Sequence, residues 1–404
     1  MSPPIIGKPH LIGNKFYDIN GNIIYLRGAN YFSNTGDHSK SWLTPTGPTT
    51  NSSSDWNTVV VPAIIGTFDK MKSMNLNYFR MHTSAQYWLQ DASYISHMPQ
   101  IAQLAADRGI YLSIDIYSVA DVWPLDSTLP FPPYEGTASK VLIPTQQAFV
   151  DLWALIANVM KNSPNVILGE IQNEPCGTYQ DNTNNWRMVD LPLFLTICQQ
   201  VITRIRSITD LPIMLQWSYG ISGSMNSART QLNLWAPNVT MDVYADDPKV
   251  QGTNIIYSTH LYEGQQLESN MAWITDSPSL AKYLTLSRIE DVASRKVVLI
   301  AELGGLRSSA PDGPASQTWM TNMMDLLYAR GIGWSNWVWF CPFNSNHGDE
   351  IVALGAVNYT PLTDKGLIIA QKTASMPNPP SGPQHMLTIM SNPSGLPFTL
   401  RKVA

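Results

Sequence analysis

Runs of β-branched and aromatic residues alternate with helical patterns along most of this 404-residue chain. Eight runs have the length and composition of buried strands, over residues 23–30, 77–82, 110–117, 166–174, 213–217, 254–262, 297–303 and 332–339. Helical patterns follow most of them, over residues 59–74, 101–108, 145–161, 191–207, 280–294 and 316–330. Eight strands that mostly alternate with helices predict an α/β fold, and specifically a (β/α)8 TIM barrel.

An open, doubly wound sheet is the alternative fold, but no Gly-rich phosphate loop follows the first predicted strand. Long connections over residues 31–55, 118–144 and 340–364 all follow strands. In a barrel these connections lie at the C-terminal face, where active sites are built. We expect one catalytic domain over residues 1–376, with the Pro-rich tail 377–404 packed on or beside the barrel.

The composition excludes several classes of protein. Only 14% of the residues are charged and the net charge is −5, so the chain lacks the basic surface that a nucleic-acid partner requires. A hydrophobic fraction of 44% argues against intrinsic disorder. No apolar run approaches the length of a membrane span. We expect a monomer without a nucleic-acid or membrane partner.

The chain begins Met-Ser-Pro-Pro, without the charged and apolar segments of a secretory signal. Low charge, 29 Pro and 13 Trp nevertheless favour an extracellular enzyme. The three Cys residues are too few for a disulfide framework, and none forms a CxxC pair.

Two predicted strands end in carboxylates, although the chain has only eight Glu residues. Strand alternation places Glu170, Gln172 and Glu174 on one face of the run 166–174. The same rule places Val298, Ile300 and Glu302 together on the run 297–303. Paired carboxylates are what glycosidic bond cleavage requires, because one protonates the leaving oxygen while the other attacks the anomeric carbon or activates water.

Polar side chains also share faces on two other predicted strands. Residues 254–262 place His260 and Tyr262 at the top of one strand, and residues 77–82 place Arg80 and His82 on one face of another. A buried Arg needs a carboxylate partner, and Glu302 is available. The sequence has no HExxH motif and no Cys/His cluster with ligand spacing, so we expect neither a metal nor a cofactor.

Tryptophans give a further signal, because flat indole surfaces stack on the apolar faces of sugar rings. Trp334, Trp337 and Trp339 lie on the last predicted strand. Core packing is the expected role of three Trp residues in predicted helices, namely Trp88, Trp153 and Trp319. No GxSxG elbow supports a Ser-His-Asp hydrolase instead.

Taken together, these residues resemble glycoside hydrolase family 5, a family of retaining enzymes with catalytic Glu residues on barrel strands four and seven. The resemblance covers roughly residues 15–372, and its most specific element is Asn173-Glu174-Pro175. Supporting motifs follow in the family's order: Arg80, Tyr257-Ser258-Thr259-His260-Leu261-Tyr262, Ala301-Glu302-Leu303-Gly304 and Trp334-Ser335-Asn336-Trp337.

The resemblance implies that Glu174 is the acid/base, Glu302 the nucleophile and Trp337 the platform under the sugar. One departure concerns the family's His near the end of strand three, because Tyr117 occupies about that position here and His82 is a candidate to compensate. The expected substrate-binding set is Arg80, His82, Tyr117, Asn173, His260, Tyr262, Trp337 and Trp339.

The expected function is that of a retaining endo-β-glycanase acting on a polysaccharide, with an endo-β-1,4-glucanase favoured. Mannan, xylan and β-1,3-glucan remain alternative substrates. β-1,3-Glucan-remodelling transglycosylases of the same clan have an opening similar to residues 13–17 of this chain. A non-catalytic carbohydrate-binding protein on the same barrel is the alternative from another functional class.

Overall fold

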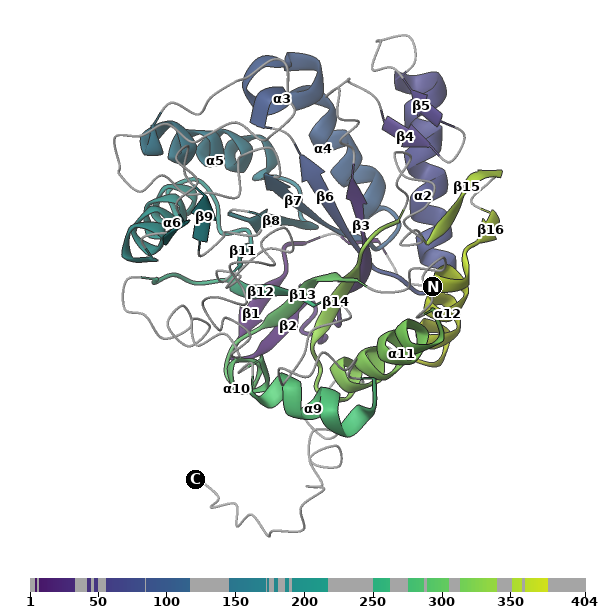
Figure 1. Ribbon diagram of the computed structural model, residues 1–404. Helices are drawn as coiled ribbons and strands as arrows, with labels where there is room; N and C mark the ends of the chain where they lie inside the picture. The colour runs from purple at the N-terminus through teal and green to yellow at the C-terminus, as the bar shows by residue number, and fades with distance from the viewer. Residues whose placement is uncertain are drawn as a thin grey trace.

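The structure is a computed structural model that describes residues 4–5, 7–32, 42–44, 47–49, 56–83, 85–116, 145–171, 173, 178–180, 186–188, 191–216, 250–261, 275–286, 289–304, 313–339, 351–357 and 360–376. Eight parallel strands form a closed barrel, which confirms the predicted (β/α)8 fold (Figure 1). In barrel order they are β3 (Arg27–Phe32), β6 (Tyr78–Thr83), β7 (Tyr111–Ile116), β8 (Val166–Glu170), β11 (Ile213–Gln216), β12 (Ile255–Leu261), β13 (Val298–Leu303) and β14 (Gly333–Asn336). Strand β14 pairs with β3 and closes the ring.

Helices surround this barrel on its outside (Figure 1). They are α2 (Val61–Ser73), α3 (Ala85–Gln90), α4 (Ala92–Ala106), α5 (Gln146–Met160), α6 (Leu191–Arg206), α9 (Ser277–Leu286), α10 (Ile289–Ala293), α11 (Gly313–Ala329) and α12 (Asp364–Ser375). A π-helical turn, η1 (Trp56–Val60), leads into α2. Among the described residues, no helix is both long and apolar enough to span a bilayer.

Four short antiparallel pairs complete the described secondary structure. They are β1 (His10–Ile12) with β2 (Lys15–Tyr17), β4 (Trp42–Thr44) with β5 (Gly47–Thr49), β9 (Thr178–Gln180) with β10 (Trp186–Met188), and β15 (Val352–Val357) with β16 (Thr360–Leu362). The predicted tail at residues 377–404 lies outside the described residues, so the domain boundary at 376 stays a prediction.

Local sequence signals explain several helix ends. The Thr145 side chain accepts a hydrogen bond from the Ala148 amide at 3.1 Å, as expected for an N-cap. Gly109 has a φ of 72°, which suits the residue that stops α4. The predicted helix 280–294 is wrong in one respect, because two helices, α9 and α10, occupy that region. Helix α12 was missed.

The first barrel strand begins later than the pattern predicts. Residues 23 and 24 pair with the β1–β2 hairpin instead, since Tyr17 bridges Ile23 and the Ile24 amide donates to the Phe16 carbonyl at 2.7 Å. A β-branched run cannot distinguish these two partners, because both use extended backbone. The eighth strand also ends early, at Asn336 rather than at residue 339.

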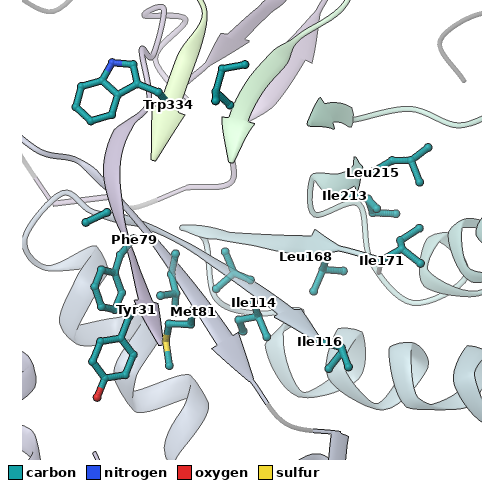
Figure 2. Packing of buried hydrophobic residues seen from close by; sticks show 14 of the residues in the cluster. Tyr31, Phe79, Met81, Ile114, Ile116, Leu168, Ile171, Ile213, Leu215 and Trp334 are labelled. Carbon is teal, nitrogen blue, oxygen red and sulfur yellow. The ribbon is translucent and has the colours of Figure 1, made fainter. Parts of the chain in front are cut away.

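Two apolar clusters hold the barrel. The outer cluster lies between the strands and the helices, and Figure 2 shows part of it around Phe79, Ile114 and Leu168. It includes three fully buried helical tryptophans, as expected from the sequence: Trp88, Trp153 and Trp319. An inner cluster fills the N-terminal half of the barrel with Tyr78, Tyr111, Ile167, Met214, Ile256, Leu299 and Ala301. Phe16 of the N-terminal hairpin packs edge-on against Tyr111, so this end of the barrel is closed.

Candidate active site

The inner faces of the barrel strands change from apolar to polar towards their C-terminal ends. On β6, Tyr78 of the inner cluster is followed on the same face by Arg80 and His82. On β12, Ile256 is followed in the same way by Ser258 and His260. All four polar side chains are buried, so they must find their partners inside the barrel.

Strand β7 follows the same rule and contributes a residue that the sequence reasoning missed. Tyr111 belongs to the inner cluster, and Ser113 and Asp115 follow on its face. Asp115 has no exposed surface and its Oδ2 lies 2.7 Å from an Arg80 nitrogen. Strand alternation could have predicted this position, because it places Asp115 on the same inward face as Ser113.

Two β-bulges turn the carboxylates of Glu170 and Glu302 into this polar layer. Leu168 and Glu170 of β8 pair with two consecutive residues of β11, Ile213 and Met214, so β8 has one extra residue between them. The pairing of β13 with β12 likewise skips from Ile300 to Glu302. Each extra residue reverses the alternation, so side chains before and after it face differently.

The predicted sharing of one face by Val298, Ile300 and Glu302 is therefore wrong. Val298 and Ile300 lie in the outer cluster, whereas Glu302 faces the interior and contacts Arg80. The bulge on β8 requires Gly169, because a Cβ there would lie 2.2 Å from the Ile114 carbonyl oxygen.

Arg80 is the centre of the site. Its NH1 nitrogen lies 2.7 Å from each of three acceptors: Asn30 Oδ1, His82 Nε2 and Glu302 Oε1. Its NH2 nitrogen lies 2.5 Å from Glu170 Oε2 and 2.7 Å from Asn173 Oδ1. The expected pairing of Arg80 with Glu302 is confirmed.

These contacts set the charge state of the site. Burial alone would lower the pKa of Arg80, but Asp115, Glu170 and Glu302 together raise it well above its ordinary value. Burial would raise the pKa of Glu170, yet Arg80, His260 and Ser258 lower it to about 2. For Asp115, burial prevails over the attraction of Arg80 and raises the pKa to about 7.

Two histidines link the carboxylates. His260 lies between Glu170 and Glu302, with its Nε2 and Nδ1 atoms each 3.3 Å from the nearer carboxylate oxygen. His82 Nδ1 lies 3.2 Å from Asp115 Oδ2, and His82 Nε2 lies 3.5 Å from Glu302 Oε1. Burial, with the nearby charge of Arg80, lowers the pKa of His82 well below its ordinary value, so this ring is neutral.

Trp337 lies beside this cluster, directly after β14. Its indole meets the His82 ring edge-on, with 5.1 Å between the ring centroids and an interplanar angle of 89°. Its carbonyl accepts a hydrogen bond from the buried ammonium group of Lys365 on α12. Trp337 remains partly exposed, whereas Trp339 is 1% exposed.

The structure thus brings together five of the ten predicted site residues around Arg80: Asn173, Glu302, His82, His260 and Arg80 itself. Trp337 contacts His82 of this group. Trp339, two residues further along the chain, is buried. Glu174, Tyr117 and Tyr262 lie outside the described residues. The sequence patterns did not predict a place in the site for Asn30, Asp115 or Lys365. They placed Glu170 and Ser258 on strand faces with other polar residues but predicted no role for either.

The described part of the chain contains no group of His, Cys, Asp or Glu side chains suited to hold a metal ion. Cys198 is buried and forms no disulfide.

A closed (β/α)8 barrel with carboxylates at the C-terminal ends of its strands is an arrangement suited to cleaving glycosidic bonds. The family model described as cellulase (glycosyl hydrolase family 5) matches residues 38–340, so the chain belongs to this family and is a glycoside hydrolase of the cellulase kind. A comparison with curated protein sequences gives no match.

Solved structures of three enzymes share the fold. A β-glucanase from Saccharophagus degradans has a TM-score of 0.62 at 16% identity, over 93% of this chain and 96% of that one. The hyperthermophilic endocellulase from Pyrococcus horikoshii has a TM-score of 0.63 at 16% identity, over 92% and 100%. The catalytic domain of the major endoglucanase from Xanthomonas campestris pv. campestris has a TM-score of 0.61 at 15% identity, over 90% and 99%.

The two shifted carboxyl groups predict how stability depends on pH. Because the folded-state pKa of Glu170 is lowered from 4.5 to about 2, its contribution is present above pH 4.5 and is lost as the pH falls towards 2. Because the folded-state pKa of Asp115 is raised from 3.8 to about 7, its contribution is complete below pH 3.8 and is lost as the pH rises towards 7. We expect their combined contribution to the free energy of unfolding to be largest near about pH 4.

Urea unfolding of the wild-type protein and of Asp115→Asn between pH 2 and 8 measures both limbs. The Asn side chain does not titrate, so the decline between about pH 4 and 7 should become shallower in this variant while the acid limb stays. An identical slope between pH 4 and 7 in the two proteins would contradict the raised pKa of Asp115.

Proposed function

We propose that this glycoside hydrolase is a retaining endo-β-1,4-glucanase in which Glu302 is the nucleophile and Glu174 the acid/base. The observation that carries the proposal is a difference in exposure among the three carboxylates around Arg80. Asp115 and Glu170 have no exposed surface, whereas Glu302 is 4% exposed. Of these three, only Glu302 has a surface from which a carboxylate oxygen can approach a sugar.

The contacts of Glu302 suit a nucleophile. Arg80 donates to its Oε1 atom at 2.7 Å, and His260 Nδ1 lies 3.3 Å from its Oε2 atom. These contacts fix the direction of the carboxylate, and the guanidinium favours its ionised form. Glu170 has a different role, since Arg80 and Ser258 each occupy one of its oxygens at 2.5 and 2.6 Å. It acts as a permanent counter-ion for Arg80.

The reaction then follows a double displacement. A Glu302 oxygen attacks the anomeric carbon while Glu174 gives its proton to the departing glycosidic oxygen. Glu174 next takes a proton from water, whose oxygen displaces Glu302 and restores the β-configuration. Asn173 directly precedes Glu174, and its amide oxygen is held by Arg80, so the same guanidinium anchors the chain next to the proposed acid/base.

Trp337 is the proposed platform for the sugar at the cleavage site, since it is partly exposed and adjoins His82 and the Arg80 cluster. The other substrate contacts are proposed, from the family resemblance, for Asn173, Tyr117, Tyr262 and Trp339. The buried Arg80, His82 and His260, which the resemblance also places at the substrate, are proposed to act through Glu302, which each of them contacts. Neither a metal nor a cofactor enters this chemistry.

A β-1,4-glucan is the proposed substrate because the matching family is described as cellulase and a similar structure is that of a Pyrococcus horikoshii endocellulase in complex with cellotetraose. The opening shared with β-1,3-glucan transglycosylases does not favour that activity. Residues 13–17 include Phe16, which closes the barrel at the end opposite the polar site. We further propose that the enzyme acts as an extracellular monomer.

Incubation with β-1,4-glucan, mixed-linkage glucan, β-1,3-glucan, mannan and xylan tests the substrate. We expect the fastest release of reducing ends from the β-1,4-linked glucans, with an early fall in viscosity that marks internal cleavage. Faster release from mannan, xylan or β-1,3-glucan would contradict the substrate assignment. No release from any polysaccharide, with folded protein, would support a binding protein instead.

The two proposed catalytic residues predict different variant behaviour. Glu302→Gln should lower kcat by about 10⁴-fold or more, because no other group can form the covalent intermediate. Glu174→Ala should lose activity on glucan but recover it with azide on an aryl cellobioside, because a good leaving group needs no acid and azide needs no general base.

Glu290→Gln is the matched control, since Glu290 lies on α10 and binds Arg330 away from the barrel interior. It should retain wild-type kinetics. Substantial turnover by Glu302→Gln, or no azide rescue of Glu174→Ala, would remove the corresponding assignment.

A further inference from the structure

Asn30 lies on β3 and has no exposed surface, yet its side chain contacts three other strands of the barrel. Its Oδ1 atom accepts a hydrogen bond from Arg80 on β6 at 2.7 Å. Its Nδ2 atom lies 3.0 Å from the Ala301 carbonyl oxygen of β13, and 3.2 Å from the carbonyl oxygens of Ser335 and Asn336 on β14. A guanidinium only donates and a carbonyl only accepts, so these partners fix the orientation of the amide.

The Ala301 carbonyl belongs to the bulge that turns Glu302 inwards. The pairing of β13 with β12 passes from Ile300 to Glu302 and skips Ala301, and the pairing of β13 with β14 passes from Ile300 to Leu303. The extra residue of a bulge is left unpaired and the ladder is disrupted there, so a side-chain donor can take the place of a ladder partner. Asn30 supplies this donor from β3, on the far side of β14.

The same residue also holds the chain on both sides of Trp337. Asn336 directly precedes Trp337, and its carbonyl accepts from the Asn30 side chain. The main-chain carbonyl of Asn30 accepts from the Trp339 amide at 2.8 Å, and the Trp337 amide donates to the Leu303 carbonyl of β13 at 3.0 Å. The segment that carries Trp337 is therefore fixed to both Asn30 and β13.

We infer that Asn30 is a positioning residue that holds Glu302, Trp337 and Arg80 in a fixed relation to one another. Because it has no exposed surface, it acts through the main chain and the guanidinium and not on the sugar. This inference rests on the proposed roles of Glu302 and Trp337. The attack requires the carboxylate oxygen and the sugar on its platform to be aligned, and a misplacement of about 1 Å can lower a rate by about 100-fold.

Asn30→Ala removes both hydrogen-bonding groups of the side chain. We expect it to lower kcat on an aryl cellobioside by about 10- to 100-fold, because Glu302 and Trp337 lose their common anchor. KM should change by less than about threefold, since the groups proposed to touch the sugar are all retained. Active sites are counted by covalent trapping with a 2-deoxy-2-fluoro-β-cellobiosyl fluoride, so unfolded protein does not enter kcat.

Asn165→Ala is the matched control. Asn165 is also fully buried, and its Nδ2 atom donates to the main-chain carbonyls of Ala102 and Ile110 at 2.9 Å each, directly before β8 at the opposite end of the barrel. Its loss should lower the free energy of unfolding but leave kcat per active site unchanged. An equal fall in kcat in both variants, or wild-type kcat per active site in Asn30→Ala, would overturn the inference.

The displacement of the platform is observed directly in protein labelled with 5-fluorotryptophan, with the Trp337 signal assigned by its loss in Trp337→Phe. The ¹⁹F resonance of Trp337 should shift in Asn30→Ala and stay in place in Asn165→Ala. A Trp337 resonance that Asn30→Ala leaves unmoved would overturn the inference, whatever the variant's stability.

Asn30→Asp covers the case in which Asn30→Ala does not fold. It keeps the oxygen that faces Arg80, whose guanidinium favours the ionised carboxylate, but it places an acceptor against the three carbonyls. Its kcat per active site should fall at least tenfold, and a wild-type value would overturn the inference. The proposed function fails separately, because Glu302→Gln would then remain active, whereas every Asn30 variant should still be trapped on Glu302.

Discussion

A buried guanidinium sets the constraint on which the rest of this site depends. Arg80 has no exposed surface, and an unpaired charge in that position would be prohibitively costly. Asp115, Glu170 and Glu302 surround it, each from a different strand. The ion cluster therefore ties β6, β7, β8 and β13 together at one level of the barrel. Of the three carboxylates, Glu302 alone keeps any exposed surface, at 4%.

The barrel can hold this cluster because its interior is divided into layers. Apolar side chains and Phe16 fill the N-terminal half, so polar groups are confined to the C-terminal half. Bulges at β8 and β13 then bring Glu170 and Glu302 inward at the height of Arg80. Lys365 reaches the same region from α12 and holds the carbonyl of Trp337, so the outer layer of helices also positions the site.

The sequence predicted the barrel, the burial of Arg80 and its pairing with Glu302, because strand alternation and charge pairing are local rules. The sequence did not predict side-chain directions that depend on the pairing with a neighbouring strand. The inward direction of the Glu302 side chain is set by a bulge in the pairing of β13 with β12. At the bulge on β8, the close approach of the Ile114 carbonyl of β7 leaves room only for a glycine at position 169. Likewise, the place of Asp115 in the site depends on its contacts with Arg80 and His82 of the neighbouring strand, which its own strand does not predict.

The central claim is that the carboxylate left accessible by the Arg80 cluster is the nucleophile, and covalent trapping tests it most directly. A 2-deoxy-2-fluoro-β-cellobiosyl fluoride reacts through its good leaving group, while the 2-fluoro substituent slows hydrolysis of the intermediate. The account predicts one fluorocellobiosyl group per chain by intact mass, located on Glu302 by peptide mapping. An adduct on Glu170 or another residue, or no adduct from enzyme that still cleaves glucan, would contradict it.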